Sequence, residues 1–347
     1  MLTRRRLALV IPALLAAAPL PAQTTAAPQP PTDSSAFIIT PGMLADPLDP
    51  HHFDLTEQPM RIGRDEGSRM TMPVEIAGNS YDFVIDTGSQ RTIIATELAQ
   101  KLALPQLPPV EIVSMAGRVT VPVVTLSGLR YGDHFVEQMD ALSIGHADLG
   151  GAGLIGLDGL KDKRLTLDFK ARRMDIGKSR RAPTKAQSDP DTIVVEARSR
   201  LGQLILVDSR IDGKRVSVIL DTGAEISVGN MALFDKLKVK KLLVPPTPTT
   251  LTSVTGVEVP ALFTVVRTIS IGSVALENVP MVFLDAAPFA ELDLADRPAM
   301  LLGMRMLRMF DRVAIDFGNR HVDFRLRQSA ADSPAVQVAA ASNALVR

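Results

Sequence analysis

Two aspartates, Asp86 and Asp221, each open an Asp-Thr-Gly tripeptide that directly follows a short apolar run. A carboxyl group just past a buried strand, beside a glycine that allows close approach of the backbone, is held rigidly at one point of the surface. Two carboxyl groups in close contact cannot both ionise cheaply, so they share one proton and titrate as a coupled pair. Asp86 and Asp221 could therefore supply an acid and a base in one site, although spacing does not assign the base.

The two tripeptides belong to a longer internal repeat, which makes coincidence a poor explanation. A shift of 135 residues aligns the tripeptides and the segments before them, and a shift of 147 or 148 residues aligns segments further on. The aligned pairs are Ile76 with Ile211, Gly78 with Gly213, Phe83 with Val218, residues 154–156 with 301–303, residues 168–169 with 316–317, and residues 174–176 with 322–324. The repeat predicts two similar lobes, each of which contributes one aspartate.

Within each lobe, β-branched residues, partial alternation and turn signals predict mostly strands. The expected strands are residues 68–77, 81–87, 111–114, 119–129 and 138–144 in the first lobe, and residues 203–211, 214–222, 251–254, 258–271 and 274–284 in the second. The first hairpin is expected to turn at Gly78-Asn79. Short helices are expected at residues 96–102 and 230–237, with Thr96 and Asn230 as N-caps, and after Gly156 and Gly303. The sequence therefore predicts an all-β protein with a few short helices.

This pattern resembles the aspartic proteases of the retropepsin and pepsin type, in a single-chain, two-lobed, bacterial-type form. In that family an apolar-apolar-Asp-Thr-Gly-Ser/Ala loop is followed by an apolar-apolar-Gly element that packs beneath it. The likeness covers residues 70–177 and 203–326. It implies two β-barrel lobes related by a pseudo-two-fold axis, at residues 66–180 and 195–327, with a linker at residues 181–194.

The resemblance also implies a mechanism. The ionised member of the pair Asp86 and Asp221 takes a proton from a water held between them, while the protonated member hydrogen-bonds the scissile carbonyl. Water adds directly, so neither an acyl-enzyme nor a cofactor nor a metal is required. The mechanism makes a peptide or unfolded protein the expected substrate.

Six neighbours of the two aspartates support them by the same analogy: Thr87, Gly88, Ser89, Thr222, Gly223 and Ala224. The threonines would hydrogen-bond across the pseudo-two-fold axis, and the glycine amides would donate to the carboxylates. Ser89 can add a hydroxyl donor that Ala224 cannot. We therefore expect the two acids to differ electrostatically.

Two hairpin tips are expected to be flaps that close over an extended peptide and pair with its backbone. Their residues are Ser114, Met115, Ala116 and Gly117 in the first tip and Ser253, Val254, Thr255 and Gly256 in the second. The first tip has no tyrosine, which departs from the pepsin pattern, and a pair of flaps is closer to retropepsin. For the second tip, a simple loop without substrate contact is an equally open interpretation.

The N-terminus has the pattern of an export signal. Arg4, Arg5 and Arg6 precede the apolar residues 7–20, and small residues continue to Ala22. Residues 3–7 also loosely resemble a twin-arginine signal. We expect residues 1–22 to be removed and the protein to be periplasmic or secreted. A retained membrane anchor is the alternative, but the apolar stretch is short for a span.

Composition is compatible with this interpretation. The chain has 347 residues, 46% of them hydrophobic, and is long enough for two domains. It has no Cys, which excludes disulfides and thiolate metal sites, and a chain of this size does not need disulfides in an oxidising compartment. Its formal net charge of zero gives no reason to expect nucleic acid or an anionic membrane as a partner. Residues 23–65 are expected to form an extended leader or propeptide-like segment, and residues 328–347 a disordered tail.

The sequence therefore predicts an exported aspartic endopeptidase with Asp86 and Asp221 as catalytic residues, for which a monomer is sufficient. A non-catalytic peptide-binding or scaffold protein on the same duplicated fold is the first alternative. Intact Asp-Thr-Gly in both copies argues against it, because a pure binder needs no pair of adjacent acids. Glycoside hydrolysis by two carboxylates is a weaker alternative, because nothing else in the chain resembles such enzymes.

Overall fold

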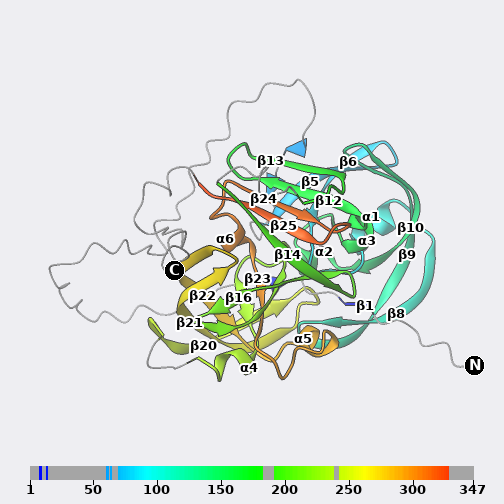
Figure 1. Ribbon diagram of the computed structural model, residues 1–347. Helices are drawn as coiled ribbons and strands as arrows, with labels where there is room; N and C mark the ends of the chain where they lie inside the picture. Colours follow the sequence, from blue (N-terminus) through cyan, green and yellow to red (C-terminus); the bar gives the residue numbers. More distant parts are fainter. Residues whose placement is uncertain are drawn as a thin grey trace, which may run out of the picture.

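The computed structural model describes residues 69–182, 191–237 and 242–327 (Figure 1). It also describes the backbone of four two-residue strands, β1 (Ala8–Leu9), β2 (Ala13–Leu14), β3 (Met60–Arg61) and β4 (Gly63–Arg64). The rest of the expected signal and leader, part of the expected linker and the tail after residue 327 lie outside the described residues.

The first lobe is built on a nine-stranded sheet with the spatial order β1-β8-β9-β10-β7-β11-β6-β5-β4. In β5, Met72, Val74 and Ile76 are buried whereas Pro73 and Glu75 are exposed, the period-two pattern of a strand with one face in the core. The strands are β5 (Met70–Ile76), β6 (Asn79–Ile85), β7 (Ile93–Ala95), β8 (Gln106–Ser114), β9 (Gly117–Tyr131), β10 (His134–Ile144) and β11 (Gly153–Ile155), and the helices are α1 (Thr96–Lys101), α2 (His146–Leu149) and α3 (Leu157–Leu160).

The second lobe repeats this order of elements. Its strands are β15 (Gln203–Leu206), β16 (Ser209–Ile211), β17 (Lys214–Arg215), β18 (Ser217–Leu220), β19 (Ser227–Gly229), β20 (Val244–Ser253), β21 (Glu258–Ile271), β22 (Val274–Phe283) and β23 (Ala299–Leu302), and its helices are α4 (Met231–Phe234), α5 (Ala287–Glu291) and α6 (Met304–Leu307). In both lobes the strand before the Asp-Thr-Gly loop pairs in parallel with the strand before the later glycine, β6 with β11 and β18 with β23. The two lobes are therefore structural copies in their central strands.

One sheet is shared by both lobes and joins them (Figure 1). The first lobe contributes β12 (Lys163–Asp168) and β13 (Arg173–Lys178) to this sheet. The second lobe contributes β14 (Thr192–Arg200), β24 (Arg312–Asp316) and β25 (His321–Arg325), together with its central strands. The contact between the copies is the antiparallel pair of β12 and β24. Strand β14 begins inside the range expected for the linker and pairs with both β25 and β15.

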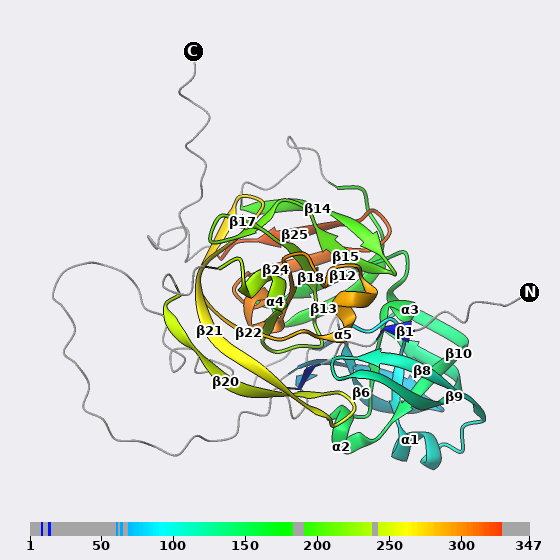
Figure 2. The ribbon, with the colours of Figure 1, turned by 90° about the horizontal axis from the view of Figure 1, so that it is seen from below.

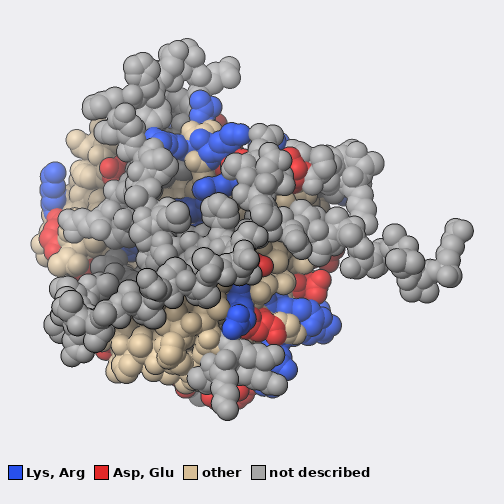
Figure 3. All heavy atoms as spheres, turned by 90° about the vertical axis from the view of Figure 1, so that its left-hand side faces the viewer, with Lys and Arg blue, Asp and Glu red and all other residues tan. Residues whose placement is uncertain are grey.

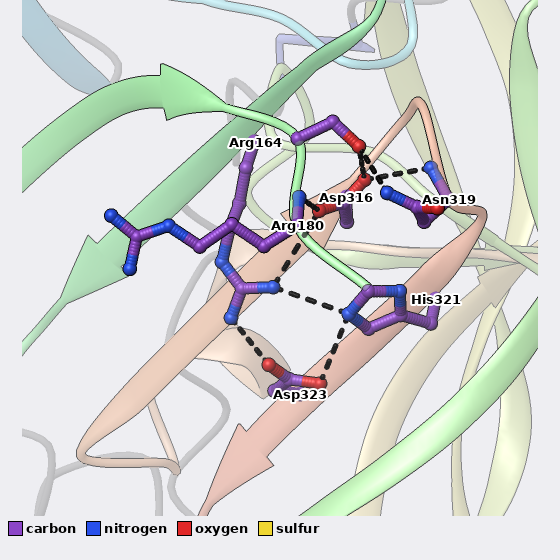
Figure 4. A network of polar contacts seen from close by, with 7 residues as sticks. Arg164, Arg180, Asp316, Asn319, His321 and Asp323 are labelled. Carbon is purple, nitrogen blue, oxygen red and sulfur yellow. Dashed lines mark hydrogen bonds and ion pairs between the residues drawn. The ribbon is translucent and has the colours of Figure 1, made fainter. Parts of the chain in front are cut away.

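A polar network lies in this shared sheet (Figure 4). Arg164 of β12 forms ion pairs with Asp323 and Asp316 of the second copy and a hydrogen bond with Nε2 of His321. Burial opposes ionisation of Asp316, but hydrogen bonds from the Ser179 hydroxyl and from two backbone amides outweigh it and lower the pKa of this carboxyl. A cation from one copy thus compensates buried carboxylates from the other.

Each expected strand has a counterpart among the described elements, and helices follow Gly156 and Gly303 as expected. Asn230 is confirmed as an N-cap, because its side chain accepts a hydrogen bond from the Leu233 amide. The expected cap at Thr96 is wrong. Thr96 is the first residue of α1, and its hydroxyl lies 2.9 Å from that of Ser143.

The first hairpin turns one residue earlier than expected, at Ala77-Gly78. Both residues have positive φ, of 50° and 74°, which is typical of the tight turn that matches the twist of a hairpin. Ile76 is consequently paired with Asn79. No helix in the described parts of the chain is long and apolar enough to cross a membrane.

Candidate active site

The two aspartates occupy equivalent positions directly after β6 and β18. The Asp86 amide donates to the carbonyl of Ile155 at 3.0 Å, and the Asp221 amide donates to the carbonyl of Leu302 at 3.1 Å. Ile155 and Leu302 end the parallel partner strands β11 and β23. Each carboxyl group is therefore anchored where two parallel strands end, in the buried part of its lobe.

Backbone amides hold one oxygen of each carboxyl group. Oδ1 of Asp86 accepts from the amides of Gly88 at 2.7 Å and Ser89 at 3.1 Å. Oδ1 of Asp221 accepts from the amides of Gly223 at 3.0 Å and Ala224 at 3.2 Å. The second oxygen, Oδ2, is buried without a hydrogen-bond partner among the described residues in both cases. Each aspartate thus has one oxygen fixed by loop amides, and its carboxyl group also interacts with the opposite carboxyl group.

Each carboxyl group lies against the loop of the other lobe, and the two glycines permit this. An ideal Cβ on Gly88 would lie 2.5 Å from Oδ1 of Asp221, and one on Gly223 would lie 2.4 Å from Cγ of Asp86. No real side chain tolerates such distances, so only glycine fits at either position. The structure therefore brings together the two aspartates that the repeat separates by 135 residues.

Two threonines join the loops by four crossed hydrogen bonds. The Thr87 hydroxyl accepts from the Thr222 amide at 3.1 Å and donates to the Leu220 carbonyl at 2.9 Å. The Thr222 hydroxyl accepts from the Thr87 amide at 3.0 Å and donates to the Ile85 carbonyl at 2.6 Å. Because all four groups are buried, the crossed bonds fix the separation and orientation of the two loops.

Burial changes the ionisation of both carboxyl groups. It raises the pKa of Asp86 from an ordinary value of 3.8 to about 6, against the hydrogen bond of the Gly88 amide and the charge of Arg69, which lower it. Burial also raises the pKa of Asp221 well above its ordinary value, and the charge of Asp86 adds to this rise. A singly protonated pair is the expected state near neutral pH, with one acid and one base side by side.

The expected role of Ser89 is wrong in its detail. Its hydroxyl donates to the Arg91 carbonyl at 2.7 Å, and only its backbone amide binds Asp86. Ala224 supplies an equivalent amide to Asp221. The hydroxyl therefore does not distinguish the two carboxyl groups.

Two buried residues next to the aspartates are not predicted by the sequence pattern. Arg69 is 1% exposed and precedes β5, and Gln203 is 1% exposed and begins β15. Arg69 donates to the carbonyl of Leu149, and Nε2 of Gln203 donates to the carbonyl of Gly88 at 2.8 Å. Their places follow from the hairpin registers, because Arg69 directly precedes the strand that pairs with β6, and Gln203 begins the strand that pairs with β18.

Both predicted flaps are hairpins that reach the opposite lobe (Figure 2). We call the hairpin of β8 and β9 the first flap and the hairpin of β20 and β21 the second flap. In the first flap, Val113 and Met115 are buried in a hydrophobic cluster whose other members, Ala224 among them, come from the second lobe. Arg118 of the same flap forms an ion pair with Glu291 of α5 at 2.7 Å.

The second flap makes the corresponding contact with α2 of the first lobe. An ideal Cβ on Gly256 at its tip would lie 2.4 Å from Oδ1 of Asp148, so the tip backbone is pressed against that helix. Ser253 and Val254 are buried. The structure therefore brings both predicted tips over the region between the lobes.

Short strands from the N-terminus pair with both flaps. Strand β1 pairs in parallel with β8, with Leu9 opposite Val113, and β2 pairs antiparallel with β20, with Ala13 opposite Ser253. With the flaps in this arrangement, Asp86 and Asp221 are both 0% exposed. The two carboxyl groups are therefore out of contact with solvent in this structure.

Among the described residues, no group of three or more His, Cys, Asp or Glu side chains could hold a metal ion. Within the part of the chain that the structure describes, Asp86 and Asp221 form a pair without a third acidic or imidazole ligand. The arrangement is suited to moving protons between two carboxyl groups.

Comparisons with known proteins assign each lobe to a protease family. Residues 72–162 match the family described as gag-polyprotein putative aspartyl protease, and residues 207–306 match the family described as aspartyl protease. Each match includes one Asp-Thr-Gly loop and one flap. The search of curated proteins found no match.

Two solved structures are similar to parts of the chain. A retropepsin-like aspartic protease from Rickettsia conorii has 20% sequence identity and a TM-score of 0.27, covering 39% of this chain and 89% of its own. Basic 7S globulin from soybean has 10% identity and a TM-score of 0.39, covering 77% of this chain and 93% of its own. With a protease domain matched in each of two similar all-β lobes, the chain belongs to the retropepsin/pepsin-like aspartic proteases.

Proposed function

We propose that the protein is an exported aspartic endopeptidase that hydrolyses peptide bonds with a water molecule activated by Asp86 and Asp221. The observation that carries the proposal is the pairing of the two carboxyl groups. Each has Oδ1 fixed by two amides and Oδ2 buried without a described partner. The family supports hydrolysis of peptides as the reaction class.

The proposed reaction needs one ionised and one protonated carboxyl group. The ionised group removes a proton from the water, whose oxygen attacks the carbonyl carbon of the scissile bond. The protonated group donates to the carbonyl oxygen, which gives a neutral tetrahedral diol. The carboxyl group that took its proton from water then donates this proton to the amide nitrogen as the carbon–nitrogen bond breaks. The other, now ionised, carboxyl group accepts a proton from a diol hydroxyl, so the pair keeps one proton throughout.

Backbone pairing at the flaps supports an extended peptide as the substrate. Both flap strands, β8 and β20, already accept an added strand from elsewhere in the same chain. An extended peptide can form the same main-chain hydrogen bonds and place alternate side chains on either side. Because main-chain pairing depends little on sequence, we expect specificity to come from the side chains that line the site.

We also propose a periplasmic or secreted location and no nucleic-acid partner. The export pattern of residues 1–22 supports the location. The formal net charge of zero supports the absence of a nucleic-acid partner. On the face in Figure 3, the described surface carries both Lys or Arg and Asp or Glu side chains. A monomer is sufficient for the proposed site, because one chain supplies both aspartates.

The test is cleavage of a mixed peptide library by the chain beginning at residue 23, from acid to mildly alkaline pH. Asp86→Asn and Asp221→Asn should each lower kcat/KM by roughly 10²- to 10⁴-fold, the range that a general acid or base contributes. Asp175→Asn is the matched control, because Asp175 is an exposed carboxyl group in β13. Cleavage that survives both dyad substitutions would contradict the proposal.

A non-catalytic peptide-binding protein remains the second candidate, favoured by the strands that already pair with both flaps. A synthetic peptide of residues 7–16 separates the two. We expect it to inhibit cleavage of the library competitively in the endopeptidase. Binding of this peptide without hydrolysis of any peptide at any pH would favour the binding protein.

A further inference from the structure

A buried arginine lies beside one of the two aspartates. Strands β5 and β6 pair antiparallel with Thr71 opposite Val84. Continued by two residues, this register places Arg69 opposite Asp86. Directly opposite residues of an antiparallel pair have Cα atoms roughly 4.5–5.5 Å apart and project to the same face. Arg69 is 1% exposed, so little water screens its charge from the carboxyl group.

The corresponding position in the second lobe holds a neutral side chain. Strands β15 and β18 pair with Ile205 opposite Ile219 and Leu206 opposite Val218. Continued by two residues, that register places Gln203 opposite Asp221. Gln203 is as buried as Arg69 but donates to the carbonyl of Gly88. One carboxyl group of the pair therefore lies opposite a cation and the other opposite an amide.

We propose that Arg69 is a positioning residue that makes Asp86 the ionised member of the pair and leaves the shared proton on Asp221. This inference rests on the proposed function and deepens it, because it assigns the base and the acid. Asp86 would then take the proton from water, and Asp221 would donate to the substrate carbonyl.

The charged groups that face the pair support this assignment. Among the described residues, those that act on Asp86 are Arg69, which lowers its pKa, and Asp221. The charge that acts on Asp221 is that of Asp86, which raises its pKa further. The other contacts of the two carboxyl groups are loop amides and are equivalent in the two lobes. The residue opposite each aspartate in the continued registers is therefore a point at which the two half-sites differ in charge.

A purely structural role for Arg69 is the competing interpretation. Its guanidinium donates to the carbonyl of Leu149, the last residue of α2. Asp148 of the same helix touches the tip of the second flap at Gly256. Arg69 could therefore hold α2 in place without influencing ionisation, and the experiment must separate the two roles.

The experiment titrates one aspartate at a time, which avoids the macroscopic pKa values of a coupled pair. In Asp221→Asn the carboxyl carbon of Asp86 is followed by NMR, and in Asp86→Asn that of Asp221, each with ¹³C-labelled aspartate. We expect Asp86 to titrate at lower pH than Asp221. Adding Arg69→Gln to Asp221→Asn should raise the pKa of Asp86 by roughly one to three units, the effect of losing a close opposite charge.

Matched variants keep the test decisive. Arg69→Lys keeps the positive charge. In the Asp221→Asn background it should therefore leave the pKa of Asp86 close to its value with Arg69, even if α2 shifts. Gln203→Arg, introduced beside Asp86→Asn, should lower the pKa of Asp221. It leaves Arg69 untouched and so remains informative if Arg69→Gln does not fold. Thermal melting reports loss of structure separately.

The proposal is overturned if Arg69→Gln lowers the melting temperature but leaves the Asp86 titration unmoved, or if Gln203→Arg leaves that of Asp221 unmoved. The NMR measurement does not require an active enzyme. Failure of the proposed endopeptidase function can therefore be distinguished from failure of the charge assignment. A wild-type protein that cleaves nothing but shows the predicted order of titration would refute the endopeptidase and keep the assignment of charge. In an active enzyme, Arg69→Gln should also move the acid limb of the kcat/KM profile to higher pH.

Discussion

In both half-sites the aspartate receives two loop amides. Continuation of the neighbouring strand registers by two residues places Arg69 opposite Asp86 but Gln203 opposite Asp221. The threonine bonds that cross between the loops are likewise equivalent. The equivalent backbone of the two halves therefore fixes the geometry of the pair, and one neighbouring side chain gives each half a different charge. The same geometry thus occurs in both halves with different electrostatics.

The same contrast appears in the shared sheet. Arg164 of β12 and Arg312 of β24 are equivalent in the repeat, yet Arg164 faces the buried carboxylates of Asp316 and Asp323. Arg312 makes no ion pair or hydrogen bond among the described side chains. One copy of the arginine thus compensates buried charge, and the other does not.

Arg164→Met tests this difference between the two arginines, and its expected effect on the free energy of unfolding is the largest. It leaves the buried carboxylates of Asp316 and Asp323 without their cation, which costs about 3–5 kcal/mol of unfolding free energy. Arg312→Met, the matched control, should stay within about 0.5 kcal/mol of wild type, as an ordinary surface change does. Urea unfolding of both variants measures the difference. Equal effects would show that the network does not stabilise the joint between the lobes.

The fold and the dyad could be predicted because the signals are local and occur twice. Asp-Thr-Gly, the later apolar-apolar-Gly and the alternating strands each have a copy, so one interpretation supports the other. Asn230 was found because an N-cap depends only on the next few residues. These features require no knowledge of how distant strands pair.

Arg69 could not be predicted because its place depends on strand register. The turn predicted at Gly78-Asn79 would set Thr71 rather than Arg69 opposite Asp86. Ala77, a residue that rarely adopts positive φ, takes the first turn position instead. A one-residue error in the position of the turn is therefore enough to miss the pairing of Arg69 with Asp86. The role of the Ser89 hydroxyl was also predicted incorrectly. It donates to the nearby carbonyl of Arg91, and the sequence pattern does not show that this acceptor is available.

The pH dependence of stability should sharpen the comparison of the half-sites. An acid whose pKa is higher in the folded state binds more protons there, so the free energy of unfolding falls as pH rises from 3.8 to about 6 because of Asp86. That shift corresponds to roughly 3 kcal/mol. For Asp221, whose pKa is raised further, the decline continues to higher pH.

Replacing either acid by Asn should therefore stabilise the protein at neutral pH and leave its stability below about pH 4 nearly unchanged. The decline should end at lower pH in Asp221→Asn than in Asp86→Asn, because Asp86 has the cation beside it. Urea unfolding between pH 3.5 and 8, on a grid of roughly half a unit, measures both curves. Two superimposable curves would mean that the half-sites are electrostatically alike.

Thr87→Val and Thr222→Val test the part of the comparison in which the halves are the same. Valine keeps the shape of threonine but leaves a buried amide and a buried carbonyl of the other loop unpaired. We expect each substitution to cost about 1–3 kcal/mol of unfolding free energy. The two costs should agree, and both variants should lose kcat, because the loops no longer hold the carboxyl groups at a fixed separation. A large difference between the two costs would show that the crossed bonds are not equivalent.

The smallest expected effect concerns the first flap, which contacts α5 through the ion pair of Arg118 and Glu291. Arg118 also pairs with Glu111 inside the same flap, at 3.2 Å, so Glu111→Gln is a matched control for Glu291→Gln. Because these groups are substantially exposed, removing the cross-lobe pair should change stability by at most about 1 kcal/mol. Flap opening is a local event, however, and depends on few contacts.

We therefore expect Glu291→Gln to increase hydrogen exchange of the β8 and β9 amides by up to about fivefold, which corresponds to 1 kcal/mol, whereas Glu111→Gln leaves it unchanged. The second flap presses on α2 through backbone rather than through an ion pair, so exchange in β20 and β21 should not respond to either substitution. Added salt should reduce the difference in the first flap only. Equal acceleration in both flaps would mean that they open as one unit, and a substrate would then require both lobes to release their flaps together.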